Sequence, residues 1–369
     1  MRLRGTELFV DLGAIEHNAK ALIAATQTPL MAVVKGNAYG HGALQAARAA
    51  LRAGAKALGV ALVEEGLELR EGGVSAPILV LGQSLERGLY EGAKADLSLC
   101  LSNIESVRAL ASAAKALRVS PKAQLKIDSG MGRIGFRSAG EAVLAYEEAI
   151  KGGITVEAVF THLATADMPG GGAYLREQKA RFEGVLLALH RAGFSGAAHA
   201  ANSAAAILYP EVRYDMVRPG IALYGGYFGA KAEDFSLRPA LTWKAPVVEI
   251  KRVEAGESLS YGRRYIAQEV RLVATLPVGY ADGYRRGMFG RAEVLIKGRR
   301  APVLGTICMD QILVDLSEIP GVELGDEAVL LGAQGKERIS GAEMAGWAGE
   351  TIDYEIFTGI SARVPRVYE

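Results

Sequence analysis

Short apolar runs alternate with longer segments of helical periodicity over roughly the first 225 residues. The runs occupy residues 31–34, 58–61, 77–82, 97–101, 123–127, 156–160, 197–201 and 215–217. In the segment 174–193, apolar residues at helical spacing line one face, namely Leu175, Phe182, Val185, Leu186 and Leu189. Several predicted helices stop at a glycine, as at Gly54, Gly72 and Gly193.

This alternation predicts parallel strands joined by right-handed helical crossovers. Eight strands are the number that closes a (β/α)8 TIM barrel, an α/β fold. An open doubly wound sheet is the alternative interpretation of the same pattern. The region between the seventh and eighth runs is the least regular, so the count depends most on that part of the chain.

The pattern changes after about residue 235. Short β-prone runs separated by Gly, Pro and charged residues follow, without a long helix between them; they lie at 241–253, 269–281, 292–305, 310–316 and 326–332. One helix is expected after Ser340, where Ser340 and Glu343 fit a capping box. We therefore predict a barrel domain over residues 8–235 and a mostly-β C-terminal domain over 236–369, with residues 1–7 as a candidate addition to the latter.

Composition narrows the class of protein. Half of the 369 residues are hydrophobic, and 42 Lys and Arg against 41 Asp and Glu leave almost no net charge. That balance argues against nucleic acid as a partner, because phosphate neutralisation calls for a basic face. The two cysteines, Cys100 and Cys308, fit a reducing cytoplasm. We find no signal peptide and no run long enough to span a bilayer, so no membrane partner is expected.

Polar residues follow the strand runs at the ends where a barrel carries its chemistry. Lys35 follows the first run and Arg133 lies beyond the fifth. The later runs are followed by His162, by Asn202 and Ser203, and by Arg218. Taken singly, a lysine at a strand end usually reaches solvent and a histidine is usually structural. Several such residues on one rim make coincidence a poor explanation.

The loops after the last two strands suggest a phosphate site. Ser203 offers a hydroxyl group, and Gly220 and Ile221 offer backbone N–H groups. No GxGxxG dinucleotide signal, P-loop or pair of histidines at metal spacing occurs, so a metal is not expected. A desolvated lysine can form a Schiff base with an aldehyde. Lysine and phosphate cradle together point to pyridoxal 5′-phosphate as the cofactor.

At this point the chain closely resembles the alanine racemases, the fold-type III pyridoxal-phosphate enzymes. The motifs that carry the resemblance span nearly the whole chain: "VVKGNAYGHG", "LKIDSGMGRIGF", "THLATAD", "ANSAA", "VRPGIALYG", "SYGRRY", "VGYADGYRR", "GTICMDQILVDL" and "TIDYEI". The resemblance implies a homodimer of a (β/α)8 barrel and a β domain, with active sites shared between subunits. It also implies interconversion of L- and D-alanine, supplying D-alanine for bacterial peptidoglycan.

The resemblance also assigns roles. Lys35 is the Schiff-base lysine and one catalytic base, and Tyr261, given by the partner subunit, is the other. His162 is expected to hydrogen-bond that tyrosine. Arg218 faces the pyridine nitrogen, and Arg133 contacts the cofactor oxygen and the substrate carboxylate. The remaining assignments are Tyr39, Asn202, Ser203, Gly220, Ile221 and Tyr354 for the cofactor, Met309 and Asp310 for the substrate, Tyr280 and Tyr354 as the gate, and Lys126 as a candidate carbamylated lysine.

Two other functions stay open on the sequence. A non-enzymatic carrier of pyridoxal phosphate would share the lysine strand and the phosphate cradle, but Tyr261, Met309 and Asp310 argue against it. Another amino-acid enzyme of the same fold is the second. Arg218 argues against a decarboxylase, because an arginine does not readily give up its proton to stabilise a carbanion. A racemase of broader specificity is harder to distinguish from an alanine racemase. The size of the substrate pocket depends in part on the motif "SYGRRY", which is bulky and basic.

Overall fold

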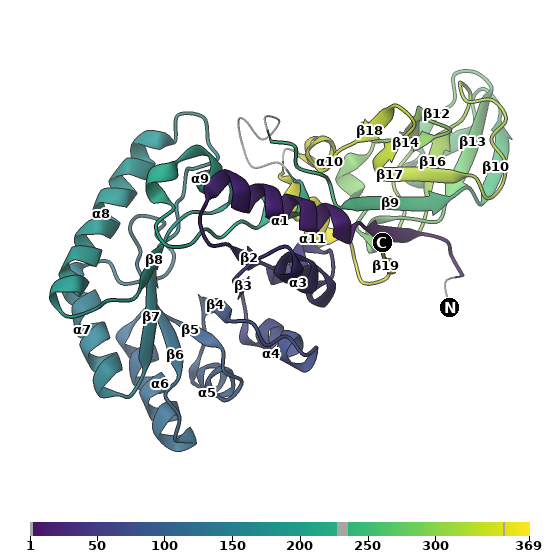
Figure 1. The fold of residues 1–369 in the computed structure, drawn as a ribbon. Coiled ribbons are helices and arrows are strands. Elements are labelled where there is room, and N and C mark those ends of the chain that lie inside the picture. The colour runs from purple at the N-terminus through teal and green to yellow at the C-terminus, as the bar shows by residue number, and fades with distance from the viewer. Residues whose placement is uncertain (1–2, 227–234, 350) are drawn as a thin grey trace. The chain divides into compact units, whose positions relative to one another are not determined.

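The structure is a computed structural model that describes residues 3–226, 235–349 and 351–369. The chain forms two compact units (Figure 1). The barrel unit comprises Ile15–Ala38 and Gly42–Arg238, and the β unit comprises Met1–Ala14, Tyr39–His41 and Pro239–Glu369. The boundary predicted between residues 235 and 236 stays a prediction.

The barrel unit contains a curled sheet of seven parallel strands that neighbour one another in chain order. They are β2 (Met31–Val33), β3 (Ala57–Val60), β4 (Ile78–Gln83), β5 (Ser98–Leu101), β6 (Lys122–Lys126), β7 (Thr155–Phe160) and β8 (Ala197–His199). Strands β3 and β5 are buried throughout, as expected for strands covered on both faces. The predicted α/β barrel fold followed by a mostly-β region is confirmed.

Helices alternate with these strands, and the longer ones from α3 to α8 lie on the outer side of the curled sheet (Figure 1). They are α1 (Leu12–Thr26), α2 (Lys35–Tyr39), α3 (Ala43–Arg52), α4 (Val63–Glu71), α5 (Glu86–Lys94), α6 (Ile104–Leu117), α7 (Ala139–Lys151), α8 (Gly172–Arg191) and α9 (Ser203–Leu208), with the 3-10 turns η1 (Pro210–Val212) and η2 (Ile221–Tyr224). All five apolar residues predicted to line one face of α8 are buried.

The eighth predicted strand is not a regular strand. The segment around residues 215–219 instead makes a few separate backbone hydrogen bonds to the strands on either side of it, β8 and β2. Asp215 N–H donates to Ala198 O at 3.0 Å, and Met31 N–H and Val33 N–H donate to Val217 O and Pro219 O at 2.9 and 3.1 Å. This segment therefore closes the curled sheet between β8 and β2, although its apolar run is too short to form a continuous ladder.

The β unit is built on a ten-stranded sheet, with the order β10-β13-β16-β15-β14-β17-β9-β1-β19 and β18 paired to β17. Its strands are β1 (Glu7–Val10), β9 (Leu241–Pro246), β10 (Glu249–Val253), β13 (Arg271–Leu276), β14 (Glu293–Ile296), β15 (Arg299–Leu304), β16 (Ile312–Asp315), β17 (Glu327–Gln334), β18 (Glu337–Ile339) and β19 (Arg366–Tyr368). A separate hairpin pairs β11 (Ser258–Leu259) with β12 (Tyr265–Ile266). Strand β1 pairs in parallel with β19 and antiparallel with β9, so the N-terminal strand completes this sheet.

Short helices complete the β unit. They are η4 (Tyr261–Arg263), η5 (Tyr280–Asp282), η6 (Arg286–Met288), α10 (Gly341–Gly349) and α11 (Asp353–Gly359). The helix expected after Ser340 is α10, and Glu343 N–H donates to Ser340 Oγ at 3.1 Å. The reciprocal half of the predicted capping box does not form, because the Glu343 carboxylate pairs with Arg300 at 2.6 Å. Helix α11 was not predicted.

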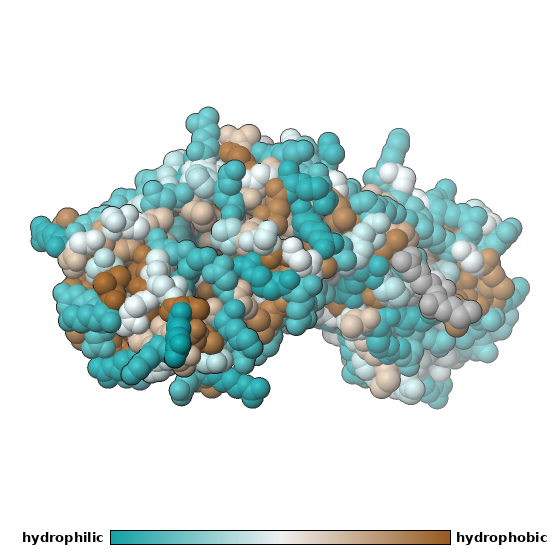
Figure 2. Space-filling view, turned by 60° about the horizontal axis from the view of Figure 1, so that its bottom comes forward, coloured by the Kyte–Doolittle hydropathy of each residue, from teal (hydrophilic) through white to brown (hydrophobic). Residues whose placement is uncertain are grey.

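Hydrophilic residues cover most of the face shown in Figure 2, with smaller apolar areas between them. Isolated exposed apolar side chains such as Leu85 and Leu62 are ordinary on a folded surface. Within the described residues, no helix is both long enough and apolar enough to cross a membrane.

Candidate active site

Lys35 stands two residues after the end of β2, where the chain enters a left-handed turn. Gly36, Asn37 and Ala38 have φ of 62°, 54° and 53°, and Tyr39 has φ of 53°. L-residues avoid this region at a cost of about 1–2 kcal/mol each, while glycine enters it freely. The turn is held by bonds from Ala38 N–H to Val34 O at 2.7 Å and from Ala43 N–H to Asn37 Oδ1 at 2.8 Å. Strain maintained in this way is typical of functional sites.

Glu65 connects this turn to the neighbouring strand end. Its carboxylate accepts Gly36 N–H at 2.5 Å, and also Ala61 N–H at 2.7 Å and Leu62 N–H at 3.1 Å. One side chain at the start of α4 thereby fixes the backbone after both β2 and β3. Its position three residues after the helix-capping residue was the available sequence signal.

Burial lowers the pKa of the Lys35 ammonium below its usual range, and the nearby charges of Arg133 and Arg218 lower it further, while Glu65 opposes them. Burial also lowers the pKa of His162 well below its usual range, and Lys126, Arg218, Arg133 and Lys35 act in the same direction. The site therefore shifts the lysine and the histidine toward their neutral forms, the forms that can accept protons.

Arg218 is 4% exposed and makes three short contacts with the barrel. It donates to Thr161 O at 2.7 Å, Ala200 O at 3.1 Å and His199 Nδ1 at 2.5 Å. Because arginine has no acceptor, His199 Nδ1 must accept, and the proton of the neutral ring lies on Nε2, which donates to Gln124 Oε1 at 2.7 Å. Burial lowers the pKa of Arg218 to about 9, which still leaves it charged at neutral pH.

Lys126 ends β6 and is also 4% exposed. Its Nζ lies 4.5 Å from the centre of the Phe160 ring, on which His199 stacks from another direction at 5.2 Å. Burial, reinforced by the charge of Arg218, lowers the pKa of Lys126 to about 7. A substantial fraction of this lysine is therefore a neutral, nucleophilic amine at physiological pH.

The predicted phosphate cradle gathers around Ser203. The Ser203 hydroxyl oxygen accepts Gly220 N–H at 2.9 Å and Ala222 N–H at 3.3 Å, and the group is buried. Ile221 begins η2, where the first N–H groups have no carbonyl partner within the turn. The Asn202 side chain caps α9 by accepting Ala205 N–H at 3.0 Å.

In the β unit, Tyr261 begins η4 with its side chain 71% exposed. The segment 306–308 holds its backbone in place, because Thr306 Oγ1 donates to Tyr261 O at 2.8 Å and Ser260 Oγ donates to Thr306 O. Cys308 Sγ lies 3.3 Å from Ser260 Oγ. The chain thus anchors the backbone of Tyr261 while leaving its phenol free to reach outward.

Tyr280 and Met309 lie near Tyr261 in the β unit, because the same segment, residues 306–309, bonds to the backbone around both tyrosines. Tyr280 N–H donates to Cys308 O and Ala281 N–H to Met309 O, both at 3.0 Å. A Cβ at Gly279 would lie 2.4 Å from Cys308 O and from Met309 C, so only glycine fits this close approach of two backbones. Asp310 pairs with Arg363 at 2.7 Å.

Tyr39 and Tyr354 pack together in the β unit, with ring centres 5.8 Å apart. Burial raises the pKa of the Tyr39 phenol above its usual range, so it remains a hydroxyl donor. His41, for which the sequence suggested no role beyond holding its loop, is fully buried, and its ring lies 5.8 Å from that of Phe357.

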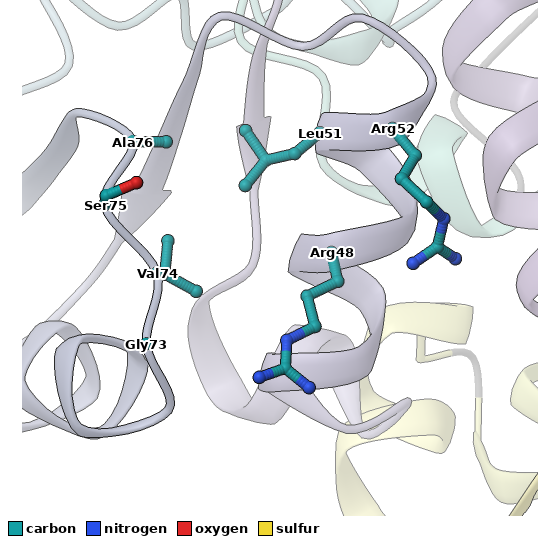
Figure 3. Close-up of a pocket in the computed structure, with 7 residues that line it drawn as sticks. All are labelled: Arg48, Leu51, Arg52, Gly73, Val74, Ser75 and Ala76. Atoms are coloured by element: carbon teal, nitrogen blue, oxygen red, sulfur yellow. The ribbon is translucent and has the colours of Figure 1, made fainter.

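A surface pocket lies elsewhere on the barrel unit, between α3 and the loop before β4 (Figure 3). It is lined by Arg48, Leu51, Arg52 and residues 73–76. Arg52 pairs with Glu16 at 2.7 Å, and Arg48 donates to Gly72 O at 2.7 Å. Because this loop leads into a strand, the pocket lies on the rim opposite Lys35 and takes no part in the candidate site.

The structure thus brings Lys35, Lys126, Arg133, His162 and Arg218 together on one rim of the barrel unit. It brings Tyr261, Tyr280 and Met309 together in the β unit. Sequence reasoning missed a set of uncharged or acidic partners, namely Glu65, Gln124, Gln178, His199 and Ala222. Among the described residues, no group of three or more His, Cys, Asp or Glu could hold a metal.

Comparison with known proteins places this geometry in a family. The sequence model "Alanine racemase, N-terminal domain" matches residues 10–228, and "Alanine racemase, C-terminal domain" matches residues 240–368. The alanine racemase of Symbiobacterium thermophilum is 49% identical over 99% of this chain and 97% of its own length.

Solved structures agree with the sequence match. Alanine racemase from D-cycloserine-producing Streptomyces lavendulae superposes with a TM-score of 0.95 and 38% identity, covering 100% of this chain and 98% of that one. Histidine racemase from Leuconostoc mesenteroides subsp. sake has a TM-score of 0.91 and 29% identity, covering 100% and 99%. The chain belongs to the alanine racemase family.

Proposed function

We propose that this enzyme interconverts L- and D-alanine with pyridoxal 5′-phosphate as cofactor, through two bases on opposite faces of the substrate. The observation that carries the proposal is the half-buried Lys35 amine after a strand end, where desolvation and the charges of Arg133 and Arg218 lower its pKa. A racemase must remove a proton from one face of the α-carbon and return one to the other. A lysine with a lowered pKa is suited to the first requirement, because its neutral amine is the form that accepts a proton.

The residues present fit the cofactor. Lys35 Nζ would hold its aldehyde carbon, and the Ser203 hydroxyl with the N–H groups of Gly220 and Ile221 would hold its phosphate. Tyr39, Asn202 and Tyr354 complete the proposed contacts. When bound, the cofactor supplies an electron-withdrawing ring that acidifies the α-proton of the substrate.

Arg218 is proposed to face the pyridine nitrogen. Arg218 donates hydrogen bonds to the Thr161 and Ala200 carbonyls and to His199 Nδ1, and these bonds fix the plane of its guanidinium group. They also stabilise the positive charge on the arginine. An arginine so held donates a hydrogen bond without transferring its proton. This favours fast reprotonation of the substrate carbon, as racemisation requires.

Tyr261 is proposed as the second base, delivered by the partner subunit of a homodimer. His162, kept neutral by burial and neighbouring cations, is the proposed acceptor for the phenolic proton. The 71% exposure of Tyr261 and 52% exposure of Met309 support a surface that a second copy covers. Met309 N–H and Arg133 would bind the substrate carboxylate with Asp310 beside them, and Tyr280 and Tyr354 would narrow the entrance.

Lys126 is a proposed carbamylation site. Its pKa of about 7 supplies the neutral amine that attacks carbon dioxide. The product would be an anion among Arg133, Arg218 and Lys35, which suits a cationic pocket. We further propose that the enzyme acts in the bacterial cytoplasm and supplies D-alanine for peptidoglycan.

The proposal is tested with Lys35→Ala. The purified wild-type protein should be yellow and should racemise alanine, measured by circular dichroism of the substrate. Lys35→Ala should lose the visible band and more than about a thousandfold of the activity. Lys20→Ala, an exposed lysine on α1, is the matched control and should keep both. Racemisation by Lys35→Ala without an added amine would refute the assignment.

A racemase of broader specificity is the second candidate, favoured by the likeness to a histidine racemase over the whole chain. Turnover of alanine, serine, lysine, arginine and histidine by the same preparation separates the two. A kcat/KM for alanine that exceeds the others supports the first candidate.

A further inference from the structure

Two rim loops of the barrel unit carry Arg133 and His162. The first, residues 128–135, begins and ends at one place, because Asp128 N–H donates to Phe136 O at 3.0 Å and Phe136 N–H to Lys126 O at 2.9 Å. It therefore leaves the barrel as a closed loop with Arg133 in its second half. A closed loop of this kind needs contacts along its length to hold its residues in place.

Helix α8 supplies such contacts from three polar residues on one face, Tyr174, Gln178 and Arg181, which we name the α8 clasp. Tyr174 donates its hydroxyl to Gly130 O at 2.7 Å, and Arg181 donates to Ser129 O at 3.2 Å. The Arg181 guanidinium also lies 5.8 Å from the centre of the Tyr174 ring. Both side chains therefore fasten the first half of the Arg133 loop.

Gln178 joins this loop to the next one. It is fully buried, accepts Ala164 N–H at 2.9 Å, and donates to His162 O at 3.1 Å. Its amide nitrogen also lies 3.5 Å from Ser129 Oγ. One side chain thus bonds the backbone on both sides of Leu163 and contacts the base of the Arg133 loop.

The inner side of the loop is fixed separately. Asp128 Oδ1 accepts Gly130 N–H at 3.1 Å and Gly132 N–H at 2.9 Å. A Cβ at Gly130 would lie 2.6 Å from the Tyr174 hydroxyl, and Gly130 has φ of 139°. The tyrosine is thus packed against a backbone position that only glycine can occupy.

We propose that the α8 clasp is a positioning device that holds Arg133 at a set distance from His162 and thereby sets the affinity for the substrate carboxylate. This inference rests on the proposed function of Arg133. Helix α8 already packs on the barrel through its apolar face, so the clasp is not needed to attach the helix. Its three residues act through the loops and do not themselves contact substrate.

Tyr174→Phe tests the clasp with the loss of one hydroxyl group. We expect KM for L- and D-alanine to rise about fivefold, as for one lost hydrogen bond, with kcat nearly unchanged. The inhibition constant of propionate, which keeps the methyl and carboxylate groups of alanine, should rise by the same factor. The visible absorption of the cofactor should not change. Tyr146→Phe, on the neighbouring helix α7, is the matched control and should behave as wild type.

Hydrogen–deuterium exchange measures how firmly the α8 clasp holds the two loops, and it does not depend on catalytic turnover. Amides of residues 129–135 should exchange about fivefold faster in Tyr174→Phe than in wild type. Gln178→Met should also accelerate residues 162–165. If the wild type bound no cofactor or racemised nothing, the proposed function would fail while the exchange result still reported on the clasp. Unchanged exchange in both variants, or a Tyr174→Phe loss confined to kcat, would overturn the inference.

Discussion

The candidate residues of the barrel unit and those of the β unit are prepared for chemistry in opposite ways. On the barrel rim, Lys126 and Arg218 are each 4% exposed, and their pKa values are lowered mainly by burial. In the β unit, Tyr261 is 71% exposed, and only its backbone is fixed. The barrel thus sets protonation states within its own fold, whereas the β unit presents side chains whose environment depends on what covers them.

This difference indicates which residues contribute to folding stability as well as to activity, and which contribute to activity alone. A buried polar residue is part of the structure that holds the barrel together, so its removal should be felt in folding as well as in catalysis. An exposed residue on a fixed backbone contributes little to folding, and its removal should be felt in catalysis alone. Three experiments probe this contrast, from the largest expected effect to the smallest.

Tyr261→Phe should give the largest effect, and it should be purely catalytic. Racemisation should fall by a factor of about 10² to 10⁴, as for loss of a general base. D-Alanine should still exchange its α-proton with deuterated solvent through Lys35, while L-alanine should not, as followed by NMR. The midpoint of thermal unfolding should match wild type.

Equal exchange from both enantiomers in Tyr261→Phe would contradict the two-base assignment. Tyr265→Phe is a suitable control, since this tyrosine is half-buried at the start of β12 in the same hairpin. It should retain exchange from both enantiomers.

Arg218→Met should destabilise the barrel unit. The carbonyls of Thr161 and Ala200 and the Nδ1 of His199 would each lose a donor inside the protein. Unsatisfied buried acceptors cost about 1–3 kcal/mol each, so the free energy of unfolding should fall by about 3 kcal/mol or more. Urea denaturation followed by circular dichroism measures it.

The matched control is Arg133→Met, which removes an exposed arginine from the same rim. Its free energy of unfolding should stay within about 0.5 kcal/mol of wild type, although its KM should rise. Equal destabilisation by the two substitutions would remove the contrast between buried and exposed charges.

The buried Lys126 should make stability depend on pH. Its pKa is about 7 in the folded protein against 10.5 when unfolded, so between these values the unfolded chain binds more protons. Stability should therefore rise with pH between 7 and 10, by at most about 1.4 kcal/mol per pH unit, relative to Lys126→Met. The measurement is urea denaturation in buffer free of carbon dioxide.

Lys122→Met, at the more exposed end of the same strand, should leave the wild-type pH profile unchanged. Added bicarbonate should flatten the wild-type profile if Lys126 is carbamylated, because a carbamate no longer titrates as an amine. Parallel profiles of wild type and Lys126→Met in carbon-dioxide-free buffer would contradict the buried-amine interpretation.

Local patterns were enough to predict much of the fold. The apolar runs located the seven strands of the barrel unit to within one or two residues, and the helical face of α8 was predicted residue by residue. Lys35 could be singled out because it follows a buried run at a strand end. These features depend on side-chain periodicity along a few neighbouring residues, which the sequence states directly.

Other features depend on residues far apart in the chain. The sequence predicted a strand run at residues 215–217 and a candidate addition of residues 1–7 to the β domain, but it did not give the partners: β1 pairs with β19, and the segment 215–219 bonds to both β2 and β8. The contact of Glu65 with Gly36, and the path from Gln124 through His199 to Arg218, likewise join residues that are far apart in the sequence.

The sequence by itself therefore determined the order of the elements, the rim on which the candidate residues of the barrel unit lie and the residues to examine there. Only the tertiary structure decided their protonation and orientation. A lysine has the same intrinsic pKa wherever it stands in a sequence, and it is burial beside other cations that lowers the pKa of Lys35 and Lys126. Such burial is a property of the packed fold, to which many distant residues contribute at once.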